Sequence, residues 1–403
     1  MSPHAAPPDR GARPRAFTLV ELLVAMTLLI IITGIVVQIT NQTSNIWLGA
    51  TARIQAFQEA RAGFESLTRK LSQATLNTYY DYYNQSGTAR NQISGSAALA
   101  AFVPYTYDRY SELHFISGQA RTLLSGTSIT TQTHAVFFQA PLGYSASSSY
   151  QELDNALNAC GYFLQFDMDR ATVPSHVSLA PGYKPRYRFR LMEMTQPTEA
   201  LGIYDPAVTA ASPAHSKDCD WFVNNTGTNS RMIAENVIAL VLLPKLPPAQ
   251  DDPSAGGQGV TMAPKYNYNS RIPLNAATDP TTNPTLTDFP GDSFNAYPMG
   301  SGTTQTMTRH AQLPPTMRVV MIVIDETSAA RIQGSGTTVP PAIDLSHTTP
   351  PLFVDATQLD NDVQKVEDIC NAKSGNLTGN TTRLTHRVFN TDIIMRDSKW
   401  SNK

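Results

Sequence analysis

The sequence has few cysteines and few charged residues. It has three cysteines in 403 residues, and none of them stands in a CxxC or other metal-ligand spacing. Charged residues make up 15% of the chain, below the roughly 25% of an average soluble domain, and the formal net charge is -2. Because a protein that binds nucleic acid draws much of its affinity from a basic surface, we expect no nucleic-acid partner.

The three cysteines leave two arrangements open. In an oxidising compartment one disulfide could form, which would leave one thiol over. Alternatively all three are buried free thiols, and both arrangements fit the sequence. The residues are Cys160, Cys219 and Cys370.

The signatures of common enzyme classes are also missing. The chain has no HExxH, no His-x-His pair, no GxSxG elbow, no Walker A loop and no GxGxxG after a predicted strand. We therefore predict no catalytic residues, no metal, no cofactor and no enzymatic activity. The eight histidines are scattered along the chain: His4, His114, His134, His176, His215, His310, His347 and His386.

Residues 1–16 have the composition of a leader peptide. They carry three arginines, Arg10, Arg13 and Arg15, among four prolines. The prolines prevent a stable helix, and the arginines place positive charge beside a membrane. We predict that this segment is removed by cleavage.

Residues 17–37 form an apolar run with no basic side chain and a single acid, Glu21. As a helix the run would be about 31 Å long, the thickness of a bilayer core. A secretory signal peptide has a shorter apolar stretch of about 7–15 residues and an A-x-A cleavage site, which is missing here. We therefore predict a retained transmembrane helix, with the arginines on its cytoplasmic side and the rest of the chain exported.

An uncleaved signal anchor is the alternative, and Glu21 argues against it because a carboxylate in a membrane costs about 2.5–3.5 kcal/mol without a partner. The sequence RAFTLVELLVAM, residues 15–26, resembles the prepilin-type cleavage and methylation motif. The resemblance implies that prepilin peptidase cuts between Ala16 and Phe17, and that the new amine of Phe17 is methylated. It also implies that Glu21 neutralises the terminal amine of a neighbouring subunit during assembly. At position 16 the family nearly always has Gly.

Residues 38–78 are predicted to continue the helix in amphipathic form, to about Leu76. Apolar residues recur there at spacings of three, four or seven, which places them in one stripe. Such a stripe lets the helix cover the protein's own head. The residues are Ile46, Ala50, Ile54, Phe57, Phe64, Leu67 and Leu71.

Residues 79–403 are predicted to form one exported, β-rich head. We expect a half-buried strand in residues 161–168 and strands buried on both faces in the apolar runs 237–244 and 317–325. A long surface insert is expected at 244–316. The predicted strands are Glu112–Ile116, His134–Gln139, Gly161–Met168, Tyr187–Met194, Val237–Leu243, Arg318–Asp325 and Val388–Met395.

A short amphipathic helix is predicted over residues 359–369, before the last strand. The fold class that follows is α+β: a long N-terminal α-helix, transmembrane and then amphipathic, packed on a mainly antiparallel β-sheet head with long loops.

Two charged groups in the head admit a structural or a functional interpretation. Arg186, Arg188 and Arg190 alternate along one predicted strand, and we expect them to form ion pairs within the protein or between subunits. Asp167 and Asp169 are expected to be solvated acids, with paired carboxylates or calcium ligands as the alternative.

A cluster of tyrosines follows the long helix, at Tyr79, Tyr80, Tyr82 and Tyr83. Such a cluster usually packs where a helix leaves the core. The alternative is an adhesive or glycan-contacting patch.

The head is similar in layout to J-class minor pseudopilins of type II secretion, in which a strand near the end follows a Leu-Pro-Pro motif, here residues 313–315. The closer resemblance is to the Verru_Chthon cassette protein C family. The segments that carry it are RYRFRLMEMTQPTE (186–199), VLLPKLPP (241–248), YNYNSR (266–271), LPPTMRVVMIVIDE (313–326) and FNTDIIMRDSKW (389–400).

These resemblances imply a non-enzymatic structural subunit of a type IV pilus-like or type II secretion pseudopilus assembly, and the large head favours a minor subunit. The implied partners are prepilin peptidase, other pilin or pseudopilin subunits through the N-terminal helix, and inner-membrane lipid. The implied location is the bacterial inner membrane, single-pass, with the N-terminus cytoplasmic and the head periplasmic or extracellular after assembly. The alternative is a membrane-anchored surface adhesin or binding protein that uses a pilin-like export signal.

Overall fold

The structure is a computed structural model, and it falls into two compact units, residues 1–52 and 53–403. The predicted leader and the cleavage junction, Ala16 and Phe17, lie outside the described residues. The described residues are 18–85, 89–93, 95–150, 152–169, 173–178, 180–183, 185–204, 219–245, 263, 265–271, 311–333 and 336–398.

Helix α1 (Leu19–Leu71) is 53 residues long, and it confirms the predicted long N-terminal helix. It ends about one turn before the predicted end at Leu76. After a tight turn, the N–H of Thr75 donates to the carbonyl of Gln139, so the chain leaves the helix by bonding to a strand of the head. Of the segment predicted as its amphipathic part, residues 72–78 are not helical.

The described residues of the head form two larger sheets and one small one, and every strand pair in them is antiparallel. The larger sheet has the order β7-β6-β5-β4-β3-β9, and its strands are β3 (Ile116–Gln119), β4 (His134–Pro141), β5 (Leu157–Met168), β6 (Tyr187–Gln196), β7 (Ser230–Glu235) and β9 (Tyr268–Asn269). The second has the order β11-β10-β8, and its strands are β8 (Val237–Lys245), β10 (Thr316–Ile324) and β11 (His386–Ile394). The small sheet pairs β1 (Tyr79–Tyr83) with β2 (Thr106–Tyr110).

Short helices complete the head and confirm the α+β class. The helix predicted over 359–369 is present. The helices are α2 (Ser96–Ala100), α3 (Ala120–Leu123), α4 (Ser175–Ser178), α6 (Asp220–Val223), α8 (Glu326–Gln333) and α9 (Leu359–Cys370).

The main core lies between the two larger sheets. Strands β8 and β10 are buried on both faces, as their continuous apolar runs predict. Strand β5 differs from its prediction because Phe163 is also buried, on the second face of the sheet. Helix α6 covers that face, where the ring of Phe222 stacks on Phe137 with centroids 3.9 Å apart. The half-buried pattern therefore holds only near the end of β5.

The strand predicted over Glu112–Ile116 is wrong, because β3 begins at Ile116. The backbone N–H groups of the preceding residues donate to side chains instead of a neighbouring strand. Glu112 N and Leu113 N donate to Asn77 Oδ1, at 3.0 and 3.2 Å, and His114 N donates to Gln139 Oε1 at 2.7 Å. The other predicted strands are present, and β1, β2, β7 and β9 were not predicted. Of the predicted insert, residues 246–262, 264 and 272–310 lie outside the described part. The described residues between them include strand β9.

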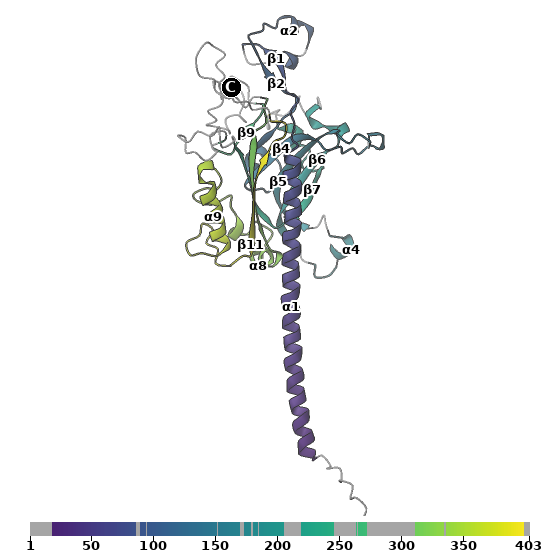
Figure 1. Cartoon of the computed structure of the whole chain (residues 1–403), viewed down its shortest axis with the longest axis vertical. Helices are drawn as coiled ribbons and strands as arrows, with labels where there is room; N and C mark the ends of the chain where they lie inside the picture. The colour runs from purple at the N-terminus through teal and green to yellow at the C-terminus, as the bar shows by residue number, and fades with distance from the viewer. Residues whose placement is uncertain are drawn as a thin grey trace, which may run out of the picture. The chain divides into compact units, whose positions relative to one another are not determined.

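The last third of α1 contacts both larger sheets, and Figure 1 shows it passing between β7 and β11. On one side Gly63 is so close to β7 that an added Cβ would lie 3.3 Å from Ala234 Cβ. On the other side the ring centroids of Phe64 and Phe389 are 5.6 Å apart. Leu67 and Leu71 are fully buried in the main core. The amphipathic stripe thus fixes this part of the helix on the head.

Candidate functional site

The start of α1 is organised around Glu21. The N–H of Glu21 donates to Thr18 Oγ1, and the N–H of Thr18 donates to Glu21 Oε2, both at 3.3 Å. This reciprocal arrangement is a capping box, which satisfies two of the N–H groups that a helix start leaves without partners. The negative charge also lies at the positive end of the helix dipole. Glu21 therefore has a local partner within its own chain.

The sequence signal for this capping box is the spacing Thr-x-x-Glu immediately before an apolar run. The resemblance to the prepilin motif gives Glu21 a partner on another subunit only. The structure adds Thr18 as a partner within the same chain. Glu21 is thus held in place at the helix start before any contact with another chain.

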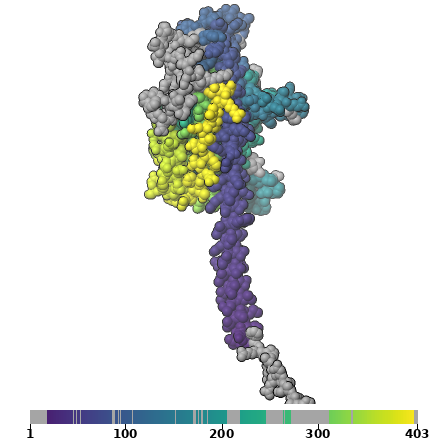
Figure 2. Space-filling view, viewed as in Figure 1, coloured from purple at the N-terminus to yellow at the C-terminus, as the bar shows by residue number. Residues whose placement is uncertain are grey.

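The apolar side chains of α1 from Leu19 to Ile39 are exposed, from 49% at Val24 to 81% at Leu19. Figure 2 draws this stretch of the helix in purple. By length and composition α1 can cross a membrane. Exposure of this many large apolar side chains to water is unfavourable, at about 25 cal/mol per Å². The segment therefore fits a membrane anchor.

The arginine row of β6 forms ion pairs inside the head, as predicted. Each arginine binds a carboxylate from a different segment, so the row joins β6 to the end of β5, to α8 and to β7. The pairs are Arg186–Asp169 at 2.9 Å, Arg188–Glu326 at 2.8 Å and Arg190–Glu235 at 3.3 Å. Each guanidinium group of the row is therefore engaged in an ion pair within the protein.

The two aspartates at the end of β5 have different surroundings. Asp167 is exposed, as predicted, but Asp169 is buried. Burial alone would raise the pKa of Asp169, but hydrogen bonds from Tyr183 and Arg186 lower it below the usual value. The prediction of a solvated acid is therefore wrong for Asp169, which is a partner in an ion pair.

A second buried carboxylate, Glu193 of β6, was not found from the sequence. It is fully buried and accepts hydrogen bonds from Lys70 of α1 at 2.6 Å and from Arg231 of β7 at 2.5 Å. The hydroxyl of Tyr162 donates to it at 2.5 Å. Burial alone would raise the pKa of Glu193, but the hydrogen bonds from Lys70 and Tyr162 lower it below the usual value.

All three cysteines are buried free thiols. Burial raises the pKa of both Cys160 and Cys370 to about 12, which disfavours the reactive thiolate. Within the described ranges, no three His, Cys, Asp or Glu side chains come together to hold a metal ion.

The buried histidines have structural partners. His134 Nδ1 accepts a hydrogen bond from Leu242 N at 3.0 Å, and its Nε2 lies 3.1 Å from the carbonyl of Phe353. His114 Nδ1 accepts one from Trp221 Nε1 at 3.1 Å. His134 thus connects β4 to β8, and His114 connects the segment before β3 to α6.

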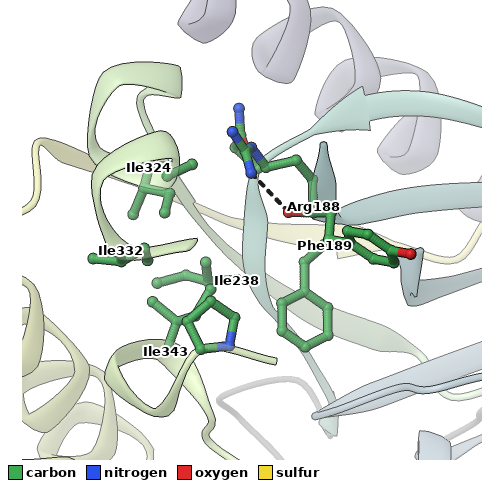
Figure 3. A pocket seen from close by; sticks show the side chains of 10 residues that line it. Arg188, Phe189, Ile238, Ile324, Ile332 and Ile343 are labelled. Carbon is green, nitrogen blue, oxygen red and sulfur yellow. Dashed lines mark hydrogen bonds between the residues drawn. The ribbon is translucent and has the colours of Figure 1, made fainter. Parts of the chain in front are cut away.

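A small cavity lies between β6, β8 and α8 (Figure 3). Its lining is mainly apolar and includes Phe189, Ile238, Ile324, Ile332 and Ile343. The cavity volume is about 10 Å³, room for no more than a single water molecule. It is packing space in the core and is too small for a substrate.

Residues 12–37 match a family model described as the prokaryotic N-terminal methylation motif. The match includes Ala16, Phe17 and Glu21 and therefore covers the predicted cleavage junction and the capped acid. Chains with this motif are substrates of prepilin peptidase and assemble with other pilin subunits. No curated protein and no solved structure matches the chain.

Proposed function

We propose that the protein is a non-enzymatic structural subunit of a type IV pilus-like or type II secretion pseudopilus assembly. The observation that carries the proposal is Glu21, an acid held at the start of an exposed apolar helix and included in the matched motif. In lipid a carboxylate requires a charged partner. The terminal amine of a neighbouring subunit supplies one.

In this proposal prepilin peptidase cuts between Ala16 and Phe17, and the new amine of Phe17 is methylated. Residues 1–16 are then the leader and residues 17–37 the membrane span. Arg10, Arg13 and Arg15 keep the N-terminus in the cytoplasm, which places the head outside the inner membrane. The helix passes once through the bilayer until assembly withdraws it from the lipid.

We assign the protein to the minor rather than the major subunits, because a head of more than 300 residues would crowd a helical polymer. The Leu-Pro-Pro motif before β10 supports similarity to J-class pseudopilins, and the segments in β6, β8, β10 and β11 support similarity to the Verru_Chthon cassette protein C family.

Mass spectrometry of the protein purified from membranes tests the processing step. We expect a mature chain that begins with N-methyl-Phe17. An intact N-terminus at Met1 in cells with active prepilin peptidase would contradict the proposal.

The substitution Glu21→Val tests assembly, with Glu21→Asp as the control that retains the charge. Glu21→Val should still insert in the membrane and should fail to enter filaments or pseudopilus complexes, measured by cross-linking to other subunits. Glu21→Asp should retain part of the assembly.

A second candidate is a membrane-anchored adhesin or binding protein with a pilin-like export signal, favoured by exposed tyrosines in the head. It predicts that Glu21→Val leaves both location and binding unchanged. The cross-linking experiment therefore distinguishes the two candidates.

A further inference from the structure

Among the described residues, the small sheet of β1 and β2 has one face in contact with the rest of the protein and one face whose tyrosines are exposed. In an antiparallel pair, residues directly opposite each other point to the same face. Tyr80 lies opposite Arg109 and Tyr82 lies opposite Tyr107, so these four residues share one face. Tyr105, two residues before Tyr107, continues the same alternation.

The tyrosines of this face are exposed. The exposed fractions are 58% for Tyr80, 46% for Tyr82, 50% for Tyr107 and 67% for Tyr105. Neighbouring rings contact one another: Tyr80 stacks on Tyr107 with centroids 5.3 Å apart, and Tyr82 lies 5.0 Å from Tyr107. We call these four residues the tyrosine face.

The opposite face of the sheet is occupied by the chain itself. Tyr83 is buried, and Asn91 donates hydrogen bonds to the hydroxyl of Tyr79 and to the carboxylate of Asp81. The two faces of one sheet therefore differ, although both are rich in tyrosine. Packing explains the tyrosines of the covered face and leaves those of the tyrosine face unexplained.

The sheet has a fixed base on the head. Asn77 Oδ1 accepts hydrogen bonds from Ser111 Oγ and from Glu112 N, both at 3.0 Å, and this links the chain before β1 to the chain after β2. Thr78 Oγ1 donates to the carbonyl of Ala311 at 2.8 Å. Figure 1 shows β1, β2 and α2 standing apart from the two larger sheets at one end of the head. The tyrosine face thus lies on a sheet that hydrogen bonds attach to the rest of the head.

The size and charge of the tyrosine face restrict its partner. Five-residue strands give a face roughly 17 Å long, on the order of 200 Å² in area, well below the about 800 Å² per partner of a stable protein interface. Arg109 is the single charged residue among the four that share the face by register. Single-stranded nucleic acid needs a basic groove beside its aromatic residues. Segments that lie in a membrane surface combine their apolar or aromatic residues with a polar face rich in Lys and Arg.

We propose that the tyrosine face binds an uncharged polysaccharide chain. A sugar ring has a face of C–H groups that stacks on a phenol ring, and a rim of hydroxyls. Those hydroxyls can exchange hydrogen bonds with the tyrosine hydroxyls. The proposal goes beyond the proposed function, because assembly through the N-terminal helix does not require it.

The test uses the full-length mature protein in detergent micelles, with insoluble cellulose, chitin and amylose as probes. Binding isotherms are measured by depletion of protein from the supernatant. We expect binding to at least one polymer, and a dissociation constant at least about tenfold higher for Tyr80→Ala/Tyr107→Ala, which corresponds to about 1.4 kcal/mol. Tyr80→Phe/Tyr107→Phe keeps the rings and should remain within about threefold of the wild type.

The matched control is Tyr144→Ala/Tyr150→Ala, two tyrosines outside the face with exposed fractions of 47% and 45%. Tyr105→Ala lies outside the paired strands and should weaken binding even if the double variant unfolds. The proposal is overturned if the wild type binds none of the polymers, or if the control variant loses as much affinity. Binding to a single-stranded oligonucleotide or to phosphatidylglycerol vesicles without binding to the polymers would also overturn it.

Discussion

Lys70 Nζ of α1 lies 2.6 Å from Glu193 Oε1 of β6. The carboxylate of Glu193 is fully buried, and it also pairs with Arg231 of β7. A buried charge is tolerated only when its partners are complete. Here one carboxylate joins α1, β6 and β7, and the hydroxyl of Tyr162 on β5 supplies a further donor. The end of the long helix is therefore attached to the larger sheet by an electrostatic contact as well as by apolar packing.

Glu193→Gln should lower the free energy of unfolding of the head by on the order of 3 kcal/mol, because it leaves Lys70 and Arg231 without their shared carboxylate. Urea unfolding followed by the fluorescence of buried Trp221 measures this change. The control is Glu65→Gln, which removes the exposed pair Arg61–Glu65 on the same helix. That pair should contribute less than about 1 kcal/mol. Equal losses in the two variants would contradict the role given to Glu193.

We expect the head to lose stability at mildly acidic pH because of the buried His134. Burial lowers its pKa to about 4 from the ordinary 6.5, although the hydrogen bond to the Phe353 carbonyl acts in the opposite direction. Because the folded-state pKa is the lower one, the stability is fully present above pH 6.5 and is lost as the pH falls from there through 4. The loss amounts to about 3 kcal/mol.

Urea unfolding of the wild type and of His134→Asn between pH 4 and pH 7 measures this dependence. Asn keeps an acceptor for Leu242 N but does not titrate. The wild type should therefore lose more stability than the variant as the pH falls. Parallel pH profiles would show that another group is responsible.

Several features of the head follow directly from local sequence. The continuous apolar runs of β8 and β10 predict strands that are buried on both faces, and both strands are buried along most of their length. Only β10 is central in its sheet, because β8 lies at the edge of the order β11-β10-β8. The alternation of Arg188 with Phe189 likewise places charge and core on opposite faces of β6, where both are buried. These predictions rest on periodicity, which the strand geometry preserves.

Other features depend on partners that are distant in sequence. Glu112 and Leu113 look like strand residues, but their N–H groups bond to the side chain of Asn77, 35 and 36 residues away. Strand β1 lacks the alternation of apolar and polar residues, because tyrosines occupy both its covered face and its exposed face. The pair Thr18 and Glu21, by contrast, has a local signal, the Thr-x-x-Glu spacing of a capping box.

Gly63→Leu should destabilise the docking of α1 on the head. A Cβ at this position would lie 3.3 Å from both Ala234 Cβ and the carbonyl oxygen of Ile233, so a larger side chain must displace the helix or the strand. We expect a loss of about 1–3 kcal/mol in unfolding free energy. Ala62→Leu, at an exposed position beside it, should change stability by less than about 0.5 kcal/mol. If Gly63→Leu were as stable as Ala62→Leu, the close approach of helix and strand would be refuted.

The three cysteines should resist alkylation in the native protein and react completely once it is unfolded. All three are buried, and burial raises the pKa of Cys160 and Cys370 to about 12, so little thiolate exists at pH 8. Intact-mass analysis after iodoacetamide treatment without reductant should show no adduct in buffer and three adducts in guanidinium chloride. A single adduct in the unfolded, unreduced protein would instead reveal a disulfide.

Ala16→Gly should accelerate removal of the leader. The resemblance to the prepilin motif places the cut after position 16, where the family nearly always has Gly. Glycine lacks the Cβ that limits how closely a backbone can approach a catalytic site. By the same reasoning Ala16→Val, with a branched side chain at the cut, should slow the removal of the leader or abolish it.

Pulse-chase labelling that follows the mass lost with residues 1–16 measures the rate of processing. The matched control is Ala12→Gly, the same substitution four residues earlier, which should leave the rate unchanged. If Ala12→Gly accelerated processing as much as Ala16→Gly, leader flexibility rather than the cleavage position would control the rate. If Ala16→Val were processed like the wild type, the peptidase would have to cut elsewhere, and Phe17 would not be the first residue of the mature chain.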